Sequence, residues 1–143
     1  MPMIRYRIGD LAMKLPREQY PEKREFAYPL FKRVIGRDTD LIRTRSGKFM
    51  VVHSFTGIIE HFSEIKQYCV IQKEFDGIII QYIPDIGFGD HILSEIEKAI
   101  HDYLQEEDFY IHFEAVEKIA PTASGKPQII QSFLIGNGLR GAV

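Results

Sequence analysis

Residues 68–83 have the sequence YCVIQKEFDGIIIQYI, which predicts a β-hairpin. Tyr68–Phe75 and Ile78–Ile83 are rich in β-branched and aromatic side chains, which favour extended backbone because they pack well on a pleated surface. Asp76-Gly77, between them, is a dipeptide typical of a tight hairpin turn. We therefore expect two paired strands that form part of a small sheet.

The segments around this hairpin predict two helices. Asp90 is the expected N-terminal cap of the longer helix. The apolar face of that helix would comprise Ile92, Leu93, Ile96, Ile100, Tyr103 and Leu104. A shorter helix is predicted from Ser54 onward by the helical spacing of Phe55, Ile58, Ile59 and Phe62.

Further strands complete the predicted sheet. Residues 109–115 alternate apolar and polar side chains, as a half-buried strand does. Leu41–Val52 predicts a second hairpin that turns at Ser46-Gly47, and residues 128–135 predict a terminal strand or a short helix. Together these elements predict an α+β fold, in which a small mixed sheet is covered by helices.

The first part of the chain does not obviously join this core. Residues 15–29 contain three prolines and predict an irregular loop, and Leu30–Ile35 predicts a short strand. The turn-forming residues of Gly36–Asp40 would end that strand. We therefore expect two domains, residues 1–37 and residues 38–143.

Composition excludes several classes of function. The chain has 143 residues, of which 45% are hydrophobic and 27% charged, with a net charge of −2. It has no run of Lys or Arg, so a nucleic-acid partner is not expected. No apolar stretch approaches the ~20 residues that span a membrane, so no membrane association is expected. Cys69 is the single cysteine and lies in an apolar strand pattern, which predicts a small buried side chain and a reducing, cytoplasmic setting.

Lys126 stands out near the end of the chain. It lies in Ala120–Pro127, a loop of small residues that follows the predicted strand at 109–115. Gly, Ser and Thr give such a loop little bulk and many backbone conformations. A lysine there can meet phosphate or carboxylate oxygens in a site built elsewhere. Alone, the pattern fits a solvated loop lysine equally well.

Three segments in order resemble motifs of adenylate-forming (AMP-binding) ligases. RYRIGD, residues 5–10, resembles the RYRTGD segment of that family, with Ile8 where Thr is usual. GRDTDLI, residues 36–42, resembles the GRxxDxI hinge segment, and PTASGK, residues 121–126, resembles the PxTxSGK loop. The resemblance covers nearly the whole chain. It is to the phenylacetate–CoA ligase group, which includes relatives in capsular polysaccharide biosynthesis and coenzyme F390 synthesis.

The resemblance implies roles for individual residues. Asp10 would bind the ribose hydroxyls of ATP, Arg37 would contact the nucleotide, and Lys126 would act in adenylation. The alternative for Asp10 is a cap on the turn after Gly9. The alternative for Arg37 is a surface salt bridge with Asp38 or Asp40.

The resemblance also implies a rotating lid. The family's lid turns about a hinge, here Asp38, Thr39 and Asp40, and Thr39 stands at the pivot where Asp or Lys is usual. After rotation, Arg45–Phe49 would face the active site in place of Lys126.

The resemblance implies ATP or AMP, Mg²⁺, coenzyme A and a small-molecule carboxylate as ligands of a complete enzyme. The family's phosphate-binding loop precedes these motifs by a few hundred residues, and nothing in this chain matches it. We therefore expect a fragment that consists of the C-terminal lid and a remnant of the N-terminal domain. Such a chain would depend on the missing domain, bind none of these cofactors alone and be inactive alone. The alternative is a non-catalytic ferredoxin-like interaction or regulatory module.

Other side chains predict no further site. The five histidines lack the spacing of a zinc site, so no metal ligands are predicted. We expect a solvated surface at the acidic end of the longer helix, which comprises Glu95, Glu97, Glu106, Glu107 and Asp108. Core or interface packing is the expected role of the aromatic residues Tyr6, Phe26, Tyr28 and Phe31.

Overall fold

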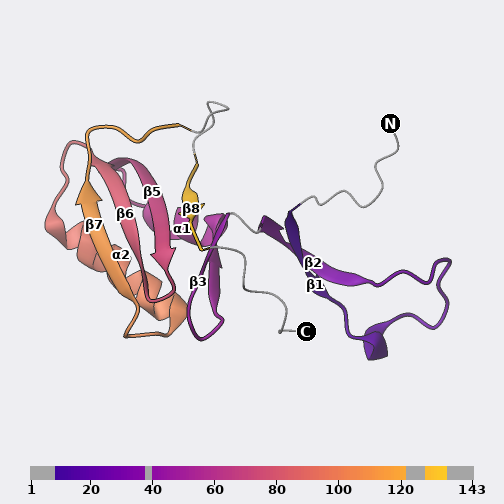
Figure 1. The fold of residues 1–143 in the computed structure, drawn as a ribbon. Helices are drawn as coiled ribbons and strands as arrows, with labels where there is room; N and C mark the ends of the chain where they lie inside the picture. Colours follow the sequence, from indigo (N-terminus) through magenta and orange to yellow (C-terminus); the bar gives the residue numbers. More distant parts are fainter. Residues whose placement is uncertain (1–8, 38–39, 122–127, 135–143) are drawn as a thin grey trace. The chain divides into compact units, whose positions relative to one another are not determined.

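A computed structural model describes residues 9–37, 40–121 and 128–134. The described residues fall into two compact units (Figure 1). The first contains residues 9–37, and the second contains residues 40–121 and 128–134.

The first unit is a two-stranded antiparallel ribbon with a long connection. Strand β1, Asp10–Lys14, pairs with strand β2, Phe31–Arg37. The predicted irregular segment between them contains one short 3₁₀ helix, Arg17–Gln19. Its loop is held by Tyr20, whose hydroxyl accepts a hydrogen bond of 3.0 Å from the Leu30 amide.

Strand β2 is longer than predicted. We expected it to end at Ile35, but it continues through Gly36 to Arg37. Gly36 has φ +149°, a conformation that side-chain-bearing residues rarely adopt. Glycine therefore lets the strand continue past the irregularity opposite Leu11 and Ala12, where turn chemistry alone predicted a break.

The second unit contains the remaining described elements. In chain order they are β3 Leu41–Arg43, β4 Phe49–Val51, α1 Val52–Ile59, β5 Ile65–Glu74, β6 Gly77–Pro84, α2 Asp90–Leu104, β7 Tyr110–Ala115 and β8 Ile130–Ser132. The larger sheet has the order β7-β6-β5-β8, and β3 and β4 form a separate pair. Strands β5 and β6 are antiparallel, whereas β7 and β8 each pair in parallel with their neighbours. The predicted mixed sheet and α+β class are thus confirmed.

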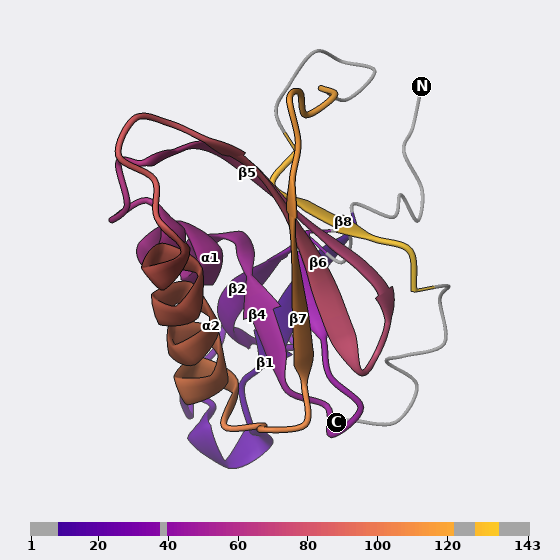
Figure 2. The same ribbon diagram turned by 90° about the vertical axis from the view of Figure 1, so that its left-hand side faces the viewer.

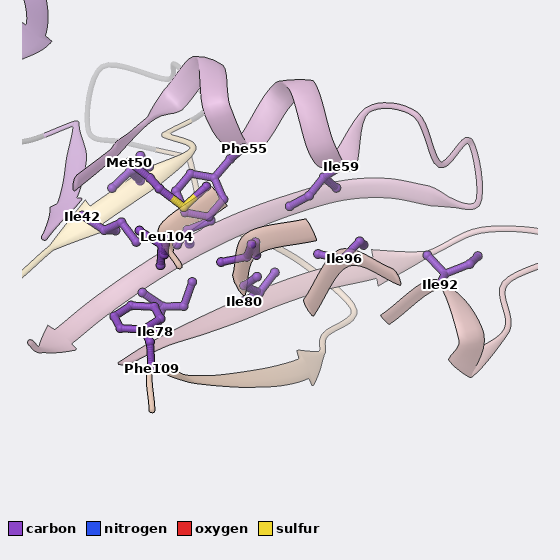
Figure 3. Close-up of a cluster of buried hydrophobic side chains, with 13 residues drawn as sticks. Ile42, Met50, Phe55, Ile59, Ile78, Ile80, Ile92, Ile96, Leu104 and Phe109 are labelled. Carbon is purple, nitrogen blue, oxygen red and sulfur yellow. The ribbon is translucent and has the colours of Figure 1, made fainter. Parts of the chain in front are cut away.

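Both helices lie on the same face of the larger sheet (Figure 2). Their apolar residues pack against inward-facing residues of the central strands, such as Val70, Ile78 and Ile80 (Figure 3). The helical side of this core consists of Phe55, Ile59, Ile92, Ile96, Ile100 and Leu104, all at most 2% exposed. Full burial of one such side chain contributes roughly 1.5–3 kcal/mol to folding. Among the described residues, no helix combines the length and apolar character that crossing a bilayer requires.

Two local predictions are wrong by one residue. The hairpin turn is formed by Phe75 and Asp76, and Gly77 is the first residue of β6. The N-terminal cap of α2 is Gly89, with extended backbone and no side-chain cap bond, and Asp90 is the first helical residue. A carboxylate in the first turn still interacts favourably with the helix dipole, so Asp90 favours the same helix from one position later.

Cys69 is fully buried in β5, as predicted. Burial raises the pKa of its thiol. A thiol with a raised pKa carries little thiolate and is a poor nucleophile, so this side chain is a packing residue.

Candidate functional site

Asp10 and Arg37, the two predicted nucleotide ligands, are directly paired across β1 and β2. Directly opposed residues of an antiparallel pair project from the same face, with Cβ atoms about 5 Å apart. Both residues are exposed. Neither side chain has a hydrogen bond or ion pair within the described part of the chain. The pair therefore offers a carboxylate acceptor and a guanidinium donor side by side.

This arrangement fits a ribose phosphate. Ribose hydroxyls can donate to the two oxygens of Asp10, and the planar fork of Arg37 matches phosphate oxygens. Asp10 lies within a strand, so the turn-cap alternative is not what the structure has. The alternative for Arg37 involves Asp38 or Asp40, and Asp38 lies outside the described residues.

The remaining predicted site residues are only partly described. Asp40 is half-buried and directly precedes β3. Asp38 and Thr39 of the predicted hinge, and Lys126 with the rest of residues 122–127, lie outside the described residues.

Backbone bonds fix both flanks of the segment that carries Lys126. The Val116 amide donates to the Tyr82 carbonyl at 2.9 Å, at the C-terminal end of β6. The Ile129 carbonyl accepts from the Val70 amide at 2.7 Å. The lysine segment therefore leaves the sheet beside Tyr82 and returns beside the middle of β5.

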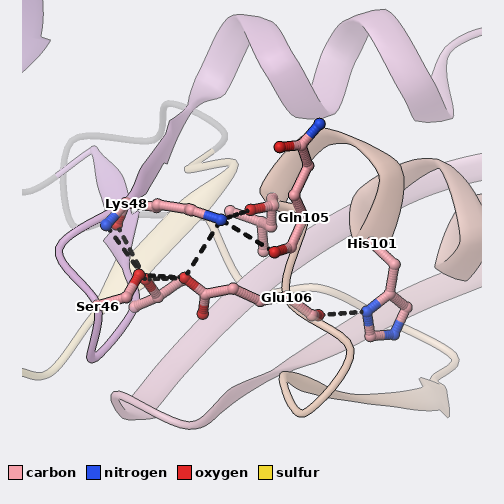
Figure 4. Close-up of polar contacts among 7 residues, drawn as sticks. Ser46, Lys48, His101, Gln105 and Glu106 are labelled. Atoms are coloured by element: carbon pink, nitrogen blue, oxygen red, sulfur yellow. Dashed lines mark hydrogen bonds and ion pairs between the residues drawn. The ribbon is translucent and has the colours of Figure 1, made fainter.

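The loop between β3 and β4 is held down by Lys48. Its amine donates to the carbonyls of Leu104, at 2.6 Å, and Gln105, at 2.9 Å (Figure 4). These carbonyls close α2, and Gln105 has left-handed backbone with φ 50°. The last carbonyls of a helix have no partner within the helix, so Lys48 supplies one from a hairpin remote in sequence.

Glu106 forms the second attachment of this loop. One of its carboxylate oxygens accepts hydrogen bonds from the hydroxyl of Thr44, at 2.9 Å, and from that of Ser46. The amine of Lys48 lies 3.9 Å from the same oxygen, and the Glu106 side chain is only 21% exposed. The prediction that this acidic residue belongs to a solvated surface is therefore wrong.

Two more contacts complete the attachment. Arg45 donates two hydrogen bonds, of 2.7 and 2.6 Å, to the Asp76 carboxylate at the β5–β6 turn. This partner lowers the pKa of Asp76. The fully buried Gln72 bonds both the amide and the carbonyl of Arg43 through its side chain. We call residues 44–48 the clamped loop.

The clamped loop and the departure point of the lysine segment lie at opposite ends of β6. Asp76, which holds Arg45, precedes the first residue of β6, whereas Val116 bonds Tyr82 near the last. At about 3.3 Å per residue, the strand between Asp76 and Tyr82 is about 20 Å long. A rigid sheet therefore separates the two.

Sequence reasoning missed Lys48, Glu106 and Gln72. Their partners lie 29 to 62 residues away in the chain, so no local pattern reveals them. The one available sign is a helix that ends at Leu104 without a glycine or a basic residue in the following position. Among the described residues, no group of three or more acidic, cysteine or histidine side chains could hold a metal ion.

Comparison with known sequences identifies one family. Residues 41–132 match the family model described as the CapK C-terminal domain. This range begins at β3 and ends with β8, so it contains the clamped loop and the whole larger sheet. The chain matches no curated protein sequence.

Solved structures with a similar fold are adenylate-forming ligases. An open conformation of 2-hydroxyisobutyryl-CoA ligase, in complex with 2-HIB-AMP and CoA, matches 85% of this chain at 17% identity, with a TM-score of 0.50. A structure from a study of fatty acyl-adenylate ligases of E. coli and L. pneumophila matches 85% at 22% identity, with a TM-score of 0.51. The chain spans only 27% and 20% of their lengths. The predicted resemblance to the C-terminal part of an adenylate-forming ligase is confirmed.

Proposed function

The chain belongs to the family of CapK C-terminal domains, and on this premise we propose that it is the mobile lid region of an ATP-dependent acyl-adenylating ligase. In the first half of the reaction, a carboxylate oxygen bonds to the α-phosphorus of ATP and pyrophosphate leaves. In the second half, a thiol sulfur bonds to the acyl carbon, the bond from that carbon to the AMP oxygen breaks, and the thiol proton passes to solvent. Coenzyme A is the proposed thiol.

One observation carries this proposal. The clamped loop is bonded to Asp76 beside the first residue of β6, and the segment that carries Lys126 leaves the sheet beside Tyr82, about 20 Å further along the strand. A small unit of this kind can present one segment or the other to a single site if the whole unit rotates. The hinge would be Asp38, Thr39 and Asp40, immediately before β3.

The proposed roles follow from the chemistry of each side chain. Lys126 would stabilise the charge that develops as the carboxylate attacks ATP, because a fixed cation acts most strongly where charge builds up. Asp10 and Arg37, paired in register, would hold the ribose and the phosphate. Mg²⁺ would accompany ATP and be held largely by its phosphates. Use of ATP and coenzyme A would place the protein in the cytoplasm.

The first unit supports the proposal of a larger partner domain. Within residues 9–37 no side chain is buried, and Phe26, Tyr28 and Phe31 are 58–71% exposed. Core packing as their role is therefore not what this structure has. An isolated two-stranded ribbon is at best marginally stable in water. We propose that this ribbon completes the large nucleotide-binding domain of a longer polypeptide.

Isotope exchange between pyrophosphate and ATP tests the function. A longer protein that contains this chain should catalyse the exchange with at least one acid of a panel of phenylacetate, octanoate and 2-hydroxyisobutyrate. The 143-residue chain alone should not. Lys126→Ala should lower the exchange rate on the order of 10²–10³-fold.

Lys118→Ala is the matched control, because Lys118 is exposed on the same connection between β7 and β8. It should leave the rate unchanged. Absence of exchange with every acid of the panel would contradict the proposed function and favour a non-catalytic module. Equal rates for Lys126→Ala and the parent protein would remove the lysine from the mechanism.

A further inference from the structure

We propose that Glu106 is a positioning residue that presets the clamped loop for the thiol-transfer half of the reaction. This inference rests on the proposed function, because that function gives the loop its task. The part that the structure itself carries is the attachment of the loop by one carboxylate.

The internal hydrogen bonds of the clamped loop centre on Thr44, whose hydroxyl accepts from the Lys48 amide at 3.2 Å and lies 3.0 Å from the Ser46 hydroxyl. The Thr44 amide donates to the Lys48 carbonyl at 2.9 Å, and the Gly47 amide donates to the Thr44 carbonyl at 3.1 Å. Gly47 has φ +90°, and no atom lies within 4 Å of where its Cβ would be. These bonds close the turn but do not attach it to the rest of the unit. Glu106 binds two hydroxyl side chains of the turn at once, and so ties it to the end of α2.

One of the two cations of the loop lies beside the same carboxylate. Lys48 is bound by the end of α2 and lies 3.9 Å from Glu106, while Arg45 is bound by Asp76. Both cations of the loop are therefore already paired. The loop therefore exposes a backbone turn at Gly47, and its two cations are already engaged by groups of the same unit.

Fixing this turn in advance would serve the transfer step. Reaction between a thiol and an acyl-adenylate requires the sulfur and the carbonyl carbon to be about 3–3.5 Å apart with correct alignment. A surface that is already rigid loses less conformational entropy when it orients the thiol. Adenylation does not use this loop in the proposed reaction, so loosening the loop should spare that half.

The structural part is tested on the 143-residue chain by amide hydrogen–deuterium exchange. Glu106→Ala should raise the exchange rates of the amides of residues 44–48 by tenfold or more, on the order expected when a local opening becomes easy. Glu107→Ala is the matched control, because Glu107 is the exposed neighbour and has no side-chain contact among the described residues. Glu106→Gln keeps a carbonyl oxygen and should give an intermediate rate.

The functional part is tested on the longer protein by measuring the two halves separately. Glu106→Ala should change pyrophosphate–ATP exchange by less than twofold and slow single-turnover transfer from acyl-AMP to coenzyme A on the order of tenfold. Glu106→Gln should recover part of the transfer rate, and Glu107→Ala should match the parent protein.

Each outcome decides a different point. Unchanged exchange at residues 44–48 in Glu106→Ala would overturn the positioning role. A loosened loop with an unchanged transfer rate would overturn its link to thiol transfer. If the parent protein forms no acyl-AMP, the proposed function itself fails, whereas the amide exchange result stands independently of it.

Discussion

The ring of Tyr110 occupies the space that a side chain at Gly77 would need. A Cβ at residue 77 would lie 2.5 Å from two carbons of that ring and 2.5 Å from the Tyr110 carbonyl oxygen. The two residues are partners in the parallel pair of β6 and β7. The Tyr110 amide donates a hydrogen bond of 3.0 Å to the backbone carbonyl of Asp76. The approach of the two strands therefore requires glycine here for space, independently of the turn.

Gly77→Ala should destabilise the chain by about 1–3 kcal/mol, because the new methyl group forces the β6–β7 pair apart. Urea unfolding followed by circular dichroism measures this. Gly57→Ala is the control: Gly57 lies within α1 with open space around it, so alanine should stabilise by about 0.5–1 kcal/mol through helix propensity. Equal effects of the two substitutions on stability would mean that the Tyr110 ring moves aside at little cost.

Gln72→Leu should destabilise the chain more than Gln67→Leu does. Gln72 is fully buried and satisfies both backbone groups of Arg43, so leucine would leave a donor and an acceptor without partners. Each unsatisfied buried group costs about 1–3 kcal/mol. Gln67→Leu, at a half-buried position of the same strand without a side-chain hydrogen bond or ion pair among the described residues, should change stability by less than about 0.5 kcal/mol. A Gln72→Leu protein as stable as the parent would show that water reaches Arg43.

Tyr68 should lower stability at alkaline pH. Its hydroxyl is buried and has no partner among the described residues, and burial, reinforced by the charge of Glu60, raises the pKa of Tyr68. Above pH about 10 the unfolded chain loses this proton while the folded chain keeps it, so stability falls as pH rises.

Tyr68→Phe should reduce that slope, to which Cys69 and Tyr82 also contribute, and stabilise the chain by up to about 1 kcal/mol at pH 7, since an unpaired buried hydroxyl is unfavourable. Urea midpoints at pH 7 and pH 11 provide the measurement, with exposed Tyr103→Phe as the control. A parent protein and a Tyr68→Phe variant with the same loss at pH 11 would contradict the assignment.

Asp76 should titrate below its usual range. The hydrogen bonds from Arg45 lower its pKa, so the stability that this pair contributes is present above the unfolded value of about 3.9 and is lost as pH falls through the folded value. A carbon-13 NMR titration of the carboxyl group should give a midpoint below 3.9 in the parent chain. In Arg45→Gln it should return to about 3.9; an identical midpoint in both proteins would rule out the contact in solution.

Periodic elements could be predicted from the sequence, whereas points of contact could not. The apolar face of α2 and the β5–β6 pair follow from spacing, because helix and strand bury residues with different periods. The turn was displaced by one residue because Gly77 meets a steric demand from Tyr110, 33 positions later in the chain. Gly36 misled in the same way, since it continues a strand that its composition suggested it would end.

In the candidate site, too, single residues could be predicted from the sequence and their contacts could not. Asp10 and Arg37 were predicted separately, each by resemblance, but their pairing across two strands follows only from the register of β1 and β2. Glu106 looked like one more acid at a helix end. Its function as an anchor depends on Thr44 and Ser46, which folding brings to it from 62 and 60 positions earlier.

The length of β6 has a consequence for the order of events in the proposed reaction. The attachment of the clamped loop at Asp76 and the departure of the lysine segment at Tyr82 are about 20 Å apart along β6, so in the proposed reaction a single bound acyl group would meet the two segments in turn. The thiol would thus be kept waiting until pyrophosphate has gone and the unit has turned. The distance along β6 would thus set the order of the two half-reactions. A more viscous solvent should slow the rotation of the unit between the two half-reactions more than it slows either chemical step.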